Sequence, residues 1–146
     1  MAETIVPPLL MTRPEPALTR DRAQLSRLVP GARVIASPLV EIERVAARPD
    51  TQGVSSAIFT SVNGVRHGAP LWPVRAGRAY CVGPRTTRAA VAAGYRATQA
   101  GETAEDLLAY LTAPGPEVRG PLFYPQGEQT SLDLTKALSD AGIEVR

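Results

Sequence analysis

Side chains able to hold an anion recur at four places where an apolar run ends and a helical pattern begins. The four junctions are Thr60-Ser61, Gly83–Thr87, Gly101–Thr103 and Gly127–Ser131. A helix start directs unpaired N–H groups and a partial positive charge outward, and both favour a carboxylate or a phosphate. Hydroxyls at the same place can also simply cap their own helix. The junctions are therefore interpreted either as anion-binding sites or as ordinary N-caps.

The segment Ser55–Arg66 shows most clearly how such a junction is built. A short apolar run, 57–59, ends at Thr60 and Ser61, and valines with helical spacing follow. A buried strand, a polar turn and a helix form the half-unit of a parallel α/β sheet. Ligands of such sheets collect at the carboxyl ends of the strands. We therefore expect Thr60 and Ser61 to lie at a strand end and to face a ligand, unless they only cap the helix.

The rest of the chain repeats this pattern and predicts the elements that would position the junctions. Strands that alternate with helices indicate an α/β fold with a parallel sheet. Residues 39–43 are expected to be extended, and 45–53 are interpreted as a linker. Strands are predicted at 8–12, 33–37, 56–60, 79–82, 95–99, 122–124 and 143–145, and helices at 16–28, 62–68, up to 93, 104–111 and 131–141.

Composition narrows the function classes. The chain has 146 residues, 44% of them hydrophobic and 21% charged, which is typical of one globular domain or slightly more. The net charge is +2 and the charges are mixed along the chain, so a nucleic-acid partner is not expected. Of the sixteen basic residues, only Lys136 is not Arg. This bias suits carboxylate or phosphate ligands, or it reflects a GC-rich genome.

Targeting and catalytic signatures are both missing from the sequence. No apolar stretch is long enough for a membrane span and no signal peptide is recognisable, so a cytoplasmic protein is expected. Nucleotide-binding glycine loops, cysteine pairs and a nucleophile elbow are absent. His67 is the only histidine and is interpreted as a surface or packing residue. Cys81, the only cysteine, lies in an apolar run and is expected to be a buried, inert thiol.

Six segments together resemble uroporphyrinogen-III synthase. They occur in order and with the spacing of that family, and they cover nearly the whole chain. No single motif is decisive, but the combination is specific. The segments are Leu9–Pro14, Pro38–Glu43, Ala57–Val65, Tyr80–Thr86, Gly101–Leu107 and Leu122–Glu128.

The resemblance implies an α/β fold of two parallel-sheet lobes, the second complete and the first only partly present. Residues 1–37 would form the incomplete first lobe (β-α-β), and 38–53 the connector between the lobes. Residues 54–142 would form the second lobe, and 143–146 the start of the returning connector. A lone β-α-β piece cannot bury its apolar face. Partial exposure is therefore expected, unless another chain covers them, for Leu9, Leu10, Ile35 and Leu39.

The resemblance also implies a reaction of porphyrin and heme biosynthesis. Members of the family are hydro-lyases that cyclise hydroxymethylbilane, a linear tetrapyrrole, to uroporphyrinogen III. The reaction inverts the last ring, releases water and uses no metal or organic cofactor. Catalysis would come mainly from holding a flexible, carboxylate-rich molecule in one conformation. The implied partner is this small-molecule substrate, handed over by hydroxymethylbilane synthase, with no nucleic acid and no membrane.

Carried over by motif, seven residues would line the cleft between the lobes. Thr86 matches the threonine of the family's Val-Gly-x-x-Thr turn, whereas Gln126 replaces an Arg found in many relatives. The tyrosine thought to assist loss of water in the family lies beyond Arg146, so no catalytic residue is assigned and weak or no activity is expected. The substrate-binding candidates are Thr12, Arg13, Thr60, Ser61, Thr86, Gln126 and Gly127.

Two other interpretations of the same residues stay open. The chain could be a non-catalytic module that binds tetrapyrroles or other carboxylates through the same junctions. It could also be an unrelated small α/β domain in which the junctions serve only as caps.

Overall fold

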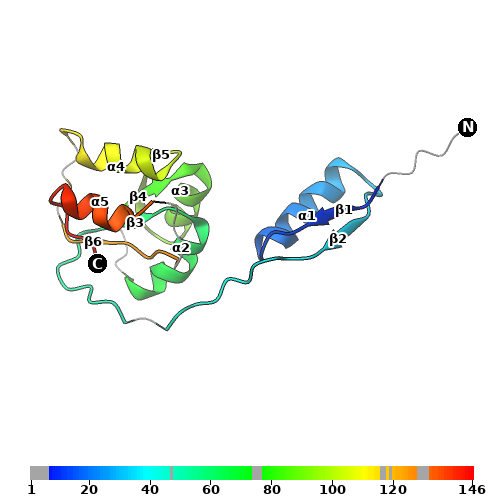
Figure 1. Ribbon diagram of the computed structural model, residues 1–146, viewed down its shortest axis with the longest axis horizontal. Helices are drawn as coiled ribbons and strands as arrows, with labels where there is room; N and C mark the ends of the chain where they lie inside the picture. The colour runs from blue at the N-terminus through cyan, green and yellow to red at the C-terminus, as the bar shows by residue number, and fades with distance from the viewer. Residues whose placement is uncertain (1–6, 47, 74–76, 116–117, 119, 128–131) are drawn as a thin grey trace, which may run out of the picture. The chain divides into compact units, whose positions relative to one another are not determined.

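The chain forms two compact units, each an α/β structure with parallel strands, which is the predicted fold class (Figure 1). The computed structural model describes residues 7–46, 48–73, 77–115, 118, 120–127 and 132–146. The units are Met1–Ala46 and Ala47–Arg146. None of the helices in these described ranges is long and apolar enough to cross a bilayer.

The first unit is a β-α-β piece whose apolar residues stay partly exposed. Strand β1 (Leu9–Met11) pairs in parallel with β2 (Val34–Ala36), and α1 (Ala17–Leu28) connects them. One helix cannot cover both faces of a two-stranded sheet. The exposure that the sequence predicts is therefore observed, with exposed fractions of 42% for Leu9, 63% for Leu10, 43% for Ile35 and 76% for Leu39.

The second unit is built on a four-stranded parallel sheet in the order β5-β4-β3-β6. The strands are β3 (Ser56–Phe59), β4 (Arg78–Val82), β5 (Arg96–Gly101) and β6 (Leu122–Phe123). All three pairings are parallel. Because parallel strands run in the same direction, their four carboxyl ends lie at one edge of the sheet. We call this edge the carboxyl edge.

Helices cover both faces of this sheet (Figure 1). On one face lie α2 (Val62–Gly68), the 3-10 turn η1 (Ala69–Leu71) and α3 (Gly83–Ala92). On the other lie α4 (Ala104–Thr112) and α5 (Leu134–Asp140). Every residue of the central strand β3 is consequently buried, as is usual for a parallel sheet covered on both faces.

The two faces have different apolar cores. On the α2 and α3 face, the rings of Trp72 and Tyr95 stack with centroids 5.7 Å apart, and the Tyr95 hydroxyl donates to the Trp72 carbonyl at 2.8 Å. On the α4 and α5 face, the core is largely aliphatic, and Leu107, Leu134 and Leu138 are completely buried. The core on the α2 and α3 face contains Phe59, Trp72, Tyr95 and Phe123, and Tyr80 and Tyr124 lie in the core on the other face.

Three predicted elements differ from the structure by more than one residue in extent. Helix α5 begins at Leu134 because the Asp133 carboxylate accepts from the Lys136 N–H and so caps it; the predicted start at Ser131 lies outside the described residues. Strand β5 continues to Gly101, opposite Val82, after a register shift. The predicted strand 143–145 is a single parallel bridge between Val145 and Leu122.

Two glycines let α2 approach the segment that follows β6. A Cβ added to Gly68 would lie 2.3 Å from Cγ of Pro125, and one added to Gly64 would lie 3.3 Å from the Pro125 carbonyl oxygen. These glycines are four residues apart and share one face of the helix. Close contact with Pro125 therefore explains why α2 contains glycine at both positions.

Replacing Gly68 by Ala should destabilise the protein by about 1–3 kcal/mol, because the new methyl group overpacks the contact with Pro125. Helix propensity alone would give the opposite sign, since Ala is favoured over Gly by about 0.8–1.0 kcal/mol in a helix interior. Equilibrium unfolding in urea measures the difference. A Gly68→Ala variant more stable than the parent would contradict the close contact.

Cys81 should not react with thiol reagents in the folded protein. Its side chain is completely buried. Burial raises the pKa of the thiol to about 11, although a hydrogen bond with Thr87 partly opposes this shift. At about pH 8 the reactive thiolate is therefore scarce. An aromatic disulfide reagent should label the thiol fully only after denaturation, and rapid labelling of the native chain would contradict the burial.

Candidate functional site at the carboxyl edge

The carboxyl edge of the second unit brings the predicted junctions together. Thr60 follows β3, Gly83 follows β4 and Glu102 follows β5, so the sheet order places these residues side by side along the edge. Tyr124 follows β6 at the other end of the row. The fourth junction, Gly127–Ser131, lies mostly outside the described residues.

The capping interpretation is confirmed for Ser61 and Thr103. The Ser61 hydroxyl accepts from the Gly64 N–H at 3.0 Å and caps α2. The Thr103 hydroxyl accepts from the Asp106 N–H at 3.1 Å, and the Asp106 carboxylate accepts from the N–H groups of Glu102 and Thr103 at 3.0 Å. This is a capping box. Both hydroxyls are therefore already engaged with their own helices.

The start of α3 has no side-chain cap. Its N-cap position is Val82, which has no polar side chain, and Pro84 carries no N–H. The Thr87 hydroxyl donates back to the Gly83 carbonyl at 2.9 Å, and Thr86 is only 5% exposed. The N–H groups of Gly83 and Arg85 thus donate no hydrogen bond to a capping side chain. An anion at this helix start would meet backbone N–H groups and the positive end of the helix dipole.

Three side chains surround the start of α3. Thr60 is half-buried and follows the register pair Phe59 and Cys81, and no hydrogen bond in the described residues uses its hydroxyl. Arg85 is exposed in the first turn of the helix. The Glu102 carboxylate lies 3.8 Å from the position that a Cβ of Gly83 would occupy. A carboxylate ligand would be attracted by the first two groups and repelled by Glu102.

The predicted site residues divide between the two units. Thr60, Ser61, Thr86, Gln126 and Gly127 all belong to the carboxyl edge of the second unit, where Gln126 and Gly127 are exposed. Thr12 and Arg13 belong to the first unit. Five of the seven predicted site residues therefore lie at one edge of the sheet.

Arg13 is already paired with a carboxylate. Its guanidinium contacts Asp21 at 2.7 Å. Hydrogen bonding by Arg20, together with the positive charges of Arg20 and Arg13, holds the pKa of Asp21 below its ordinary value. A ligand carboxylate at Arg13 would have to share the guanidinium with Asp21.

Glu102 was not among the candidate residues. It lies in the Gly101–Thr103 junction, but its closeness to Gly83 follows only from the pairing of β4 with β5. Within the described ranges there is no group of three or more His, Cys, Asp or Glu residues that could hold a metal ion. The groups described at this edge supply hydrogen-bond donors, hydrogen-bond acceptors and charge.

Comparison with known proteins identifies the family. The uroporphyrinogen-III synthase HemD family matches residues 2–146. Among solved structures, the uroporphyrinogen III synthase of the extreme thermophile Thermus thermophilus is 21% identical, with a TM-score of 0.49, and the match covers 92% of this chain. The chain spans 59% of the length of that structure. No curated protein matches the chain.

The capping box predicts a pH dependence of stability. Hydrogen bonds from the Glu102 and Thr103 N–H groups lower the pKa of Asp106. A lowered pKa in the folded state stabilises the fold above the ordinary carboxyl pKa, and this contribution is lost as the pH falls through the folded value. Asp106→Asn should therefore be less stable than the parent near neutral pH, and the difference should shrink in acid. Thermal unfolding measured across the acid range tests this, and a constant difference would contradict it.

Proposed function

The chain belongs to the uroporphyrinogen-III synthase family, and we propose that its carboxyl edge binds a linear tetrapyrrole during cyclisation to uroporphyrinogen III. The observation that carries this proposal is the start of α3. It lies in the middle of the carboxyl edge, between the ends of β3 and β5, and no side chain caps it. The starts of α2 and α4 in the same unit are capped by Ser61 and Thr103.

The start of α3 suits a carboxylate arm of the substrate. The N–H groups of Gly83 and Arg85 and the hydroxyl of Thr60 would donate hydrogen bonds, and the Arg85 guanidinium would add positive charge. A hydrogen bond to a charged group contributes about 1.5–3 kcal/mol. A helix terminus adds about 0.3–1 kcal/mol. A few such contacts would fix one acid arm without a cluster of arginines.

Glu102 would help to orient the substrate by repelling its carboxylate arms. Its carboxylate lies beside the start of α3, so a second acid arm cannot occupy the same place without unfavourable charge contact. One arm would therefore be held at Gly83 while the others are directed away from Glu102. Selectivity of this kind combines an attractive contact with a repulsive one.

The bound protein would then catalyse the reaction by restricting the conformation of the tetrapyrrole. A linear tetrapyrrole closes by itself when its ends meet, and the enzymatic product requires the last ring to invert before closure with loss of water. Holding the acid arms restricts the flexible molecule to conformations from which the inverted closure is faster. Thr86, Gln126 and Gly127 stay candidates along the same edge. Thr12 and Arg13 stay candidates through the family motif alone.

The proposal also covers the source of the substrate and the location of the protein. The family supports a small-molecule tetrapyrrole substrate, and we include delivery of that substrate by hydroxymethylbilane synthase and a cytoplasmic location. The alternative is a non-catalytic module that binds tetrapyrroles or other carboxylates through the same edge. The absence of a side-chain cap on α3 favours both functions equally, because it concerns binding and not turnover.

Incubation of the full chain with hydroxymethylbilane, followed by separation of the uroporphyrin isomers, tests the reaction. Catalysis predicts a type III fraction above that of the reaction without protein. The type I isomer alone would contradict catalysis by this chain. Binding of uroporphyrin III in the same preparation would then support the non-catalytic module, and no binding would contradict both functions.

Two adjacent substitutions separate ligand binding from capping. Thr60→Ala removes a hydroxyl that makes no hydrogen bond in the described residues, so uroporphyrin III binding should weaken while the melting temperature stays nearly constant. Ser61→Ala removes the cap of α2 and should cost about 1 kcal/mol of stability with little effect on affinity. Fluorescence titration and thermal unfolding measure the two effects. Unchanged affinity with a lower melting temperature in Thr60→Ala would contradict the assignment of Thr60 to ligand binding.

A further inference from the structure

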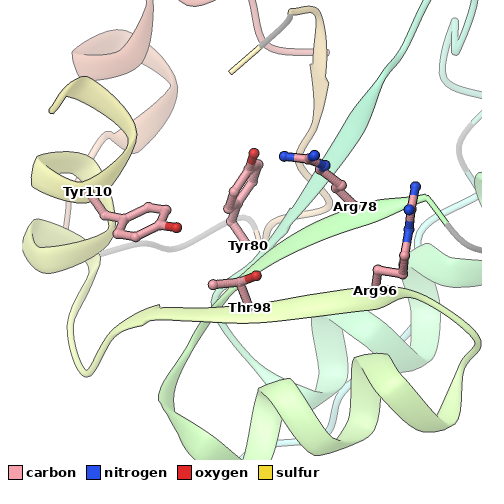
Figure 2. A pocket seen from close by; sticks show the side chains of 5 residues that line it. All are labelled: Arg78, Tyr80, Arg96, Thr98 and Tyr110. Atoms are coloured by element: carbon pink, nitrogen blue, oxygen red, sulfur yellow. The ribbon is translucent and has the colours of Figure 1, made fainter. Parts of the chain in front are cut away.

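A pocket opens on the face of the sheet that carries α4, toward the amino-terminal ends of β4 and β5 (Figure 2). Its volume is about 230 Å³. Arg78 and Tyr80 come from β4, Arg96 and Thr98 from β5, and Tyr110 from α4. All of the lining side chains except Thr98 carry a guanidinium or a phenol. The pocket therefore presents many hydrogen-bond donors, and it lies at the opposite end of the strands from the carboxyl edge.

Two arginines face the same pocket from directly opposite positions. In the parallel register, Arg78 is paired with Arg96, and Tyr80 with Thr98. Both arginines are exposed. Like charges at opposite cross-strand positions are unfavourable. No ion pair or hydrogen bond of Arg78 occurs within the described residues. An anion bound near both guanidinium groups would relieve their repulsion.

The Tyr80 hydroxyl gives an independent indication of a ligand. Tyr80 is only 4% exposed, and its hydroxyl has no hydrogen-bond partner among the described residues. A buried hydroxyl without a partner is unfavourable and calls for an explanation. Figure 2 shows Tyr80 and Arg78 projecting from the same strand among the residues that line the pocket. An acceptor atom placed in the pocket would satisfy the Tyr80 hydroxyl and the Arg78 guanidinium together, and Arg96 would add its positive charge.

We propose that this pocket binds a small oxyanion, of the carboxylate or phosphate class. The Tyr80 hydroxyl donates a hydrogen bond to it, and Arg78 and Arg96 supply the positive charge. The rings of Tyr80 and Tyr110, whose centroids lie 6.0 Å apart, form an apolar wall that would accommodate a flat organic acid. The proposal rests on Arg78, Tyr80, Arg96 and Tyr110, and it does not depend on the function proposed for the carboxyl edge.

Isothermal titration of the full chain with inorganic phosphate and, separately, with benzoate tests the site at constant ionic strength. At least one anion should bind with saturation, and Tyr80→Phe and Arg78→Gln should each weaken that binding roughly tenfold. Saturation by phosphate alone identifies a phosphate ligand, and saturation by benzoate alone identifies an organic carboxylate. Saturation by both identifies the oxyanion as the recognised group.

Arg88→Gln is the matched control. Arg88 is an exposed arginine on α3, which covers the other face of the sheet, so its loss changes the net charge equally without touching the pocket. Tyr80→Phe removes only the unpartnered hydroxyl, and its melting temperature without anion should equal or exceed that of the parent. Absence of saturable binding would overturn the proposal. So would equal weakening by Arg88→Gln and Arg78→Gln, or full affinity in Tyr80→Phe.

Discussion

The parallel pairing of β4 with β3 and β5 is the constraint on which the rest of the second unit depends. It brings the ends of three strands to one edge and the beginnings of β4 and β5 to the other. The carboxyl edge collects helix starts and short polar side chains. The opposite end collects Arg78 and Arg96. One register thus creates the two regions that we propose bind anions, each by a different chemistry.

In our proposal, helix capping determines which part of the carboxyl edge binds a ligand. The Ser61 and Thr103 hydroxyls accept hydrogen bonds from N–H groups of their own helices, so both hydroxyls are engaged in capping. At α3 the N-cap position is occupied by Val82, whose side chain cannot accept such a bond. We therefore propose that a ligand binds where this capping side chain is missing.

Most elements and their order could be predicted from the sequence, because apolar periodicity and the positions of Pro and Gly are local signals. The exposed leucines of the first unit could also be predicted, since one helix cannot cover a two-stranded sheet. The order β5-β4-β3-β6 is not a local signal. The closeness of Glu102 to Gly83, the pairing of Arg78 with Arg96 and the contact of Gly68 with Pro125 all depend on that order, so they required the structure.

The central claim is that the start of α3 binds an acid arm of a tetrapyrrole. Amide chemical shifts recorded by NMR during titration with uroporphyrin III test it most directly, because they report on the backbone N–H groups themselves. The account predicts that the largest changes occur at Gly83 and Arg85, with smaller changes at Thr60. Changes confined to Arg78 and Arg96 at the other end of the strands, or no changes at all, would contradict it.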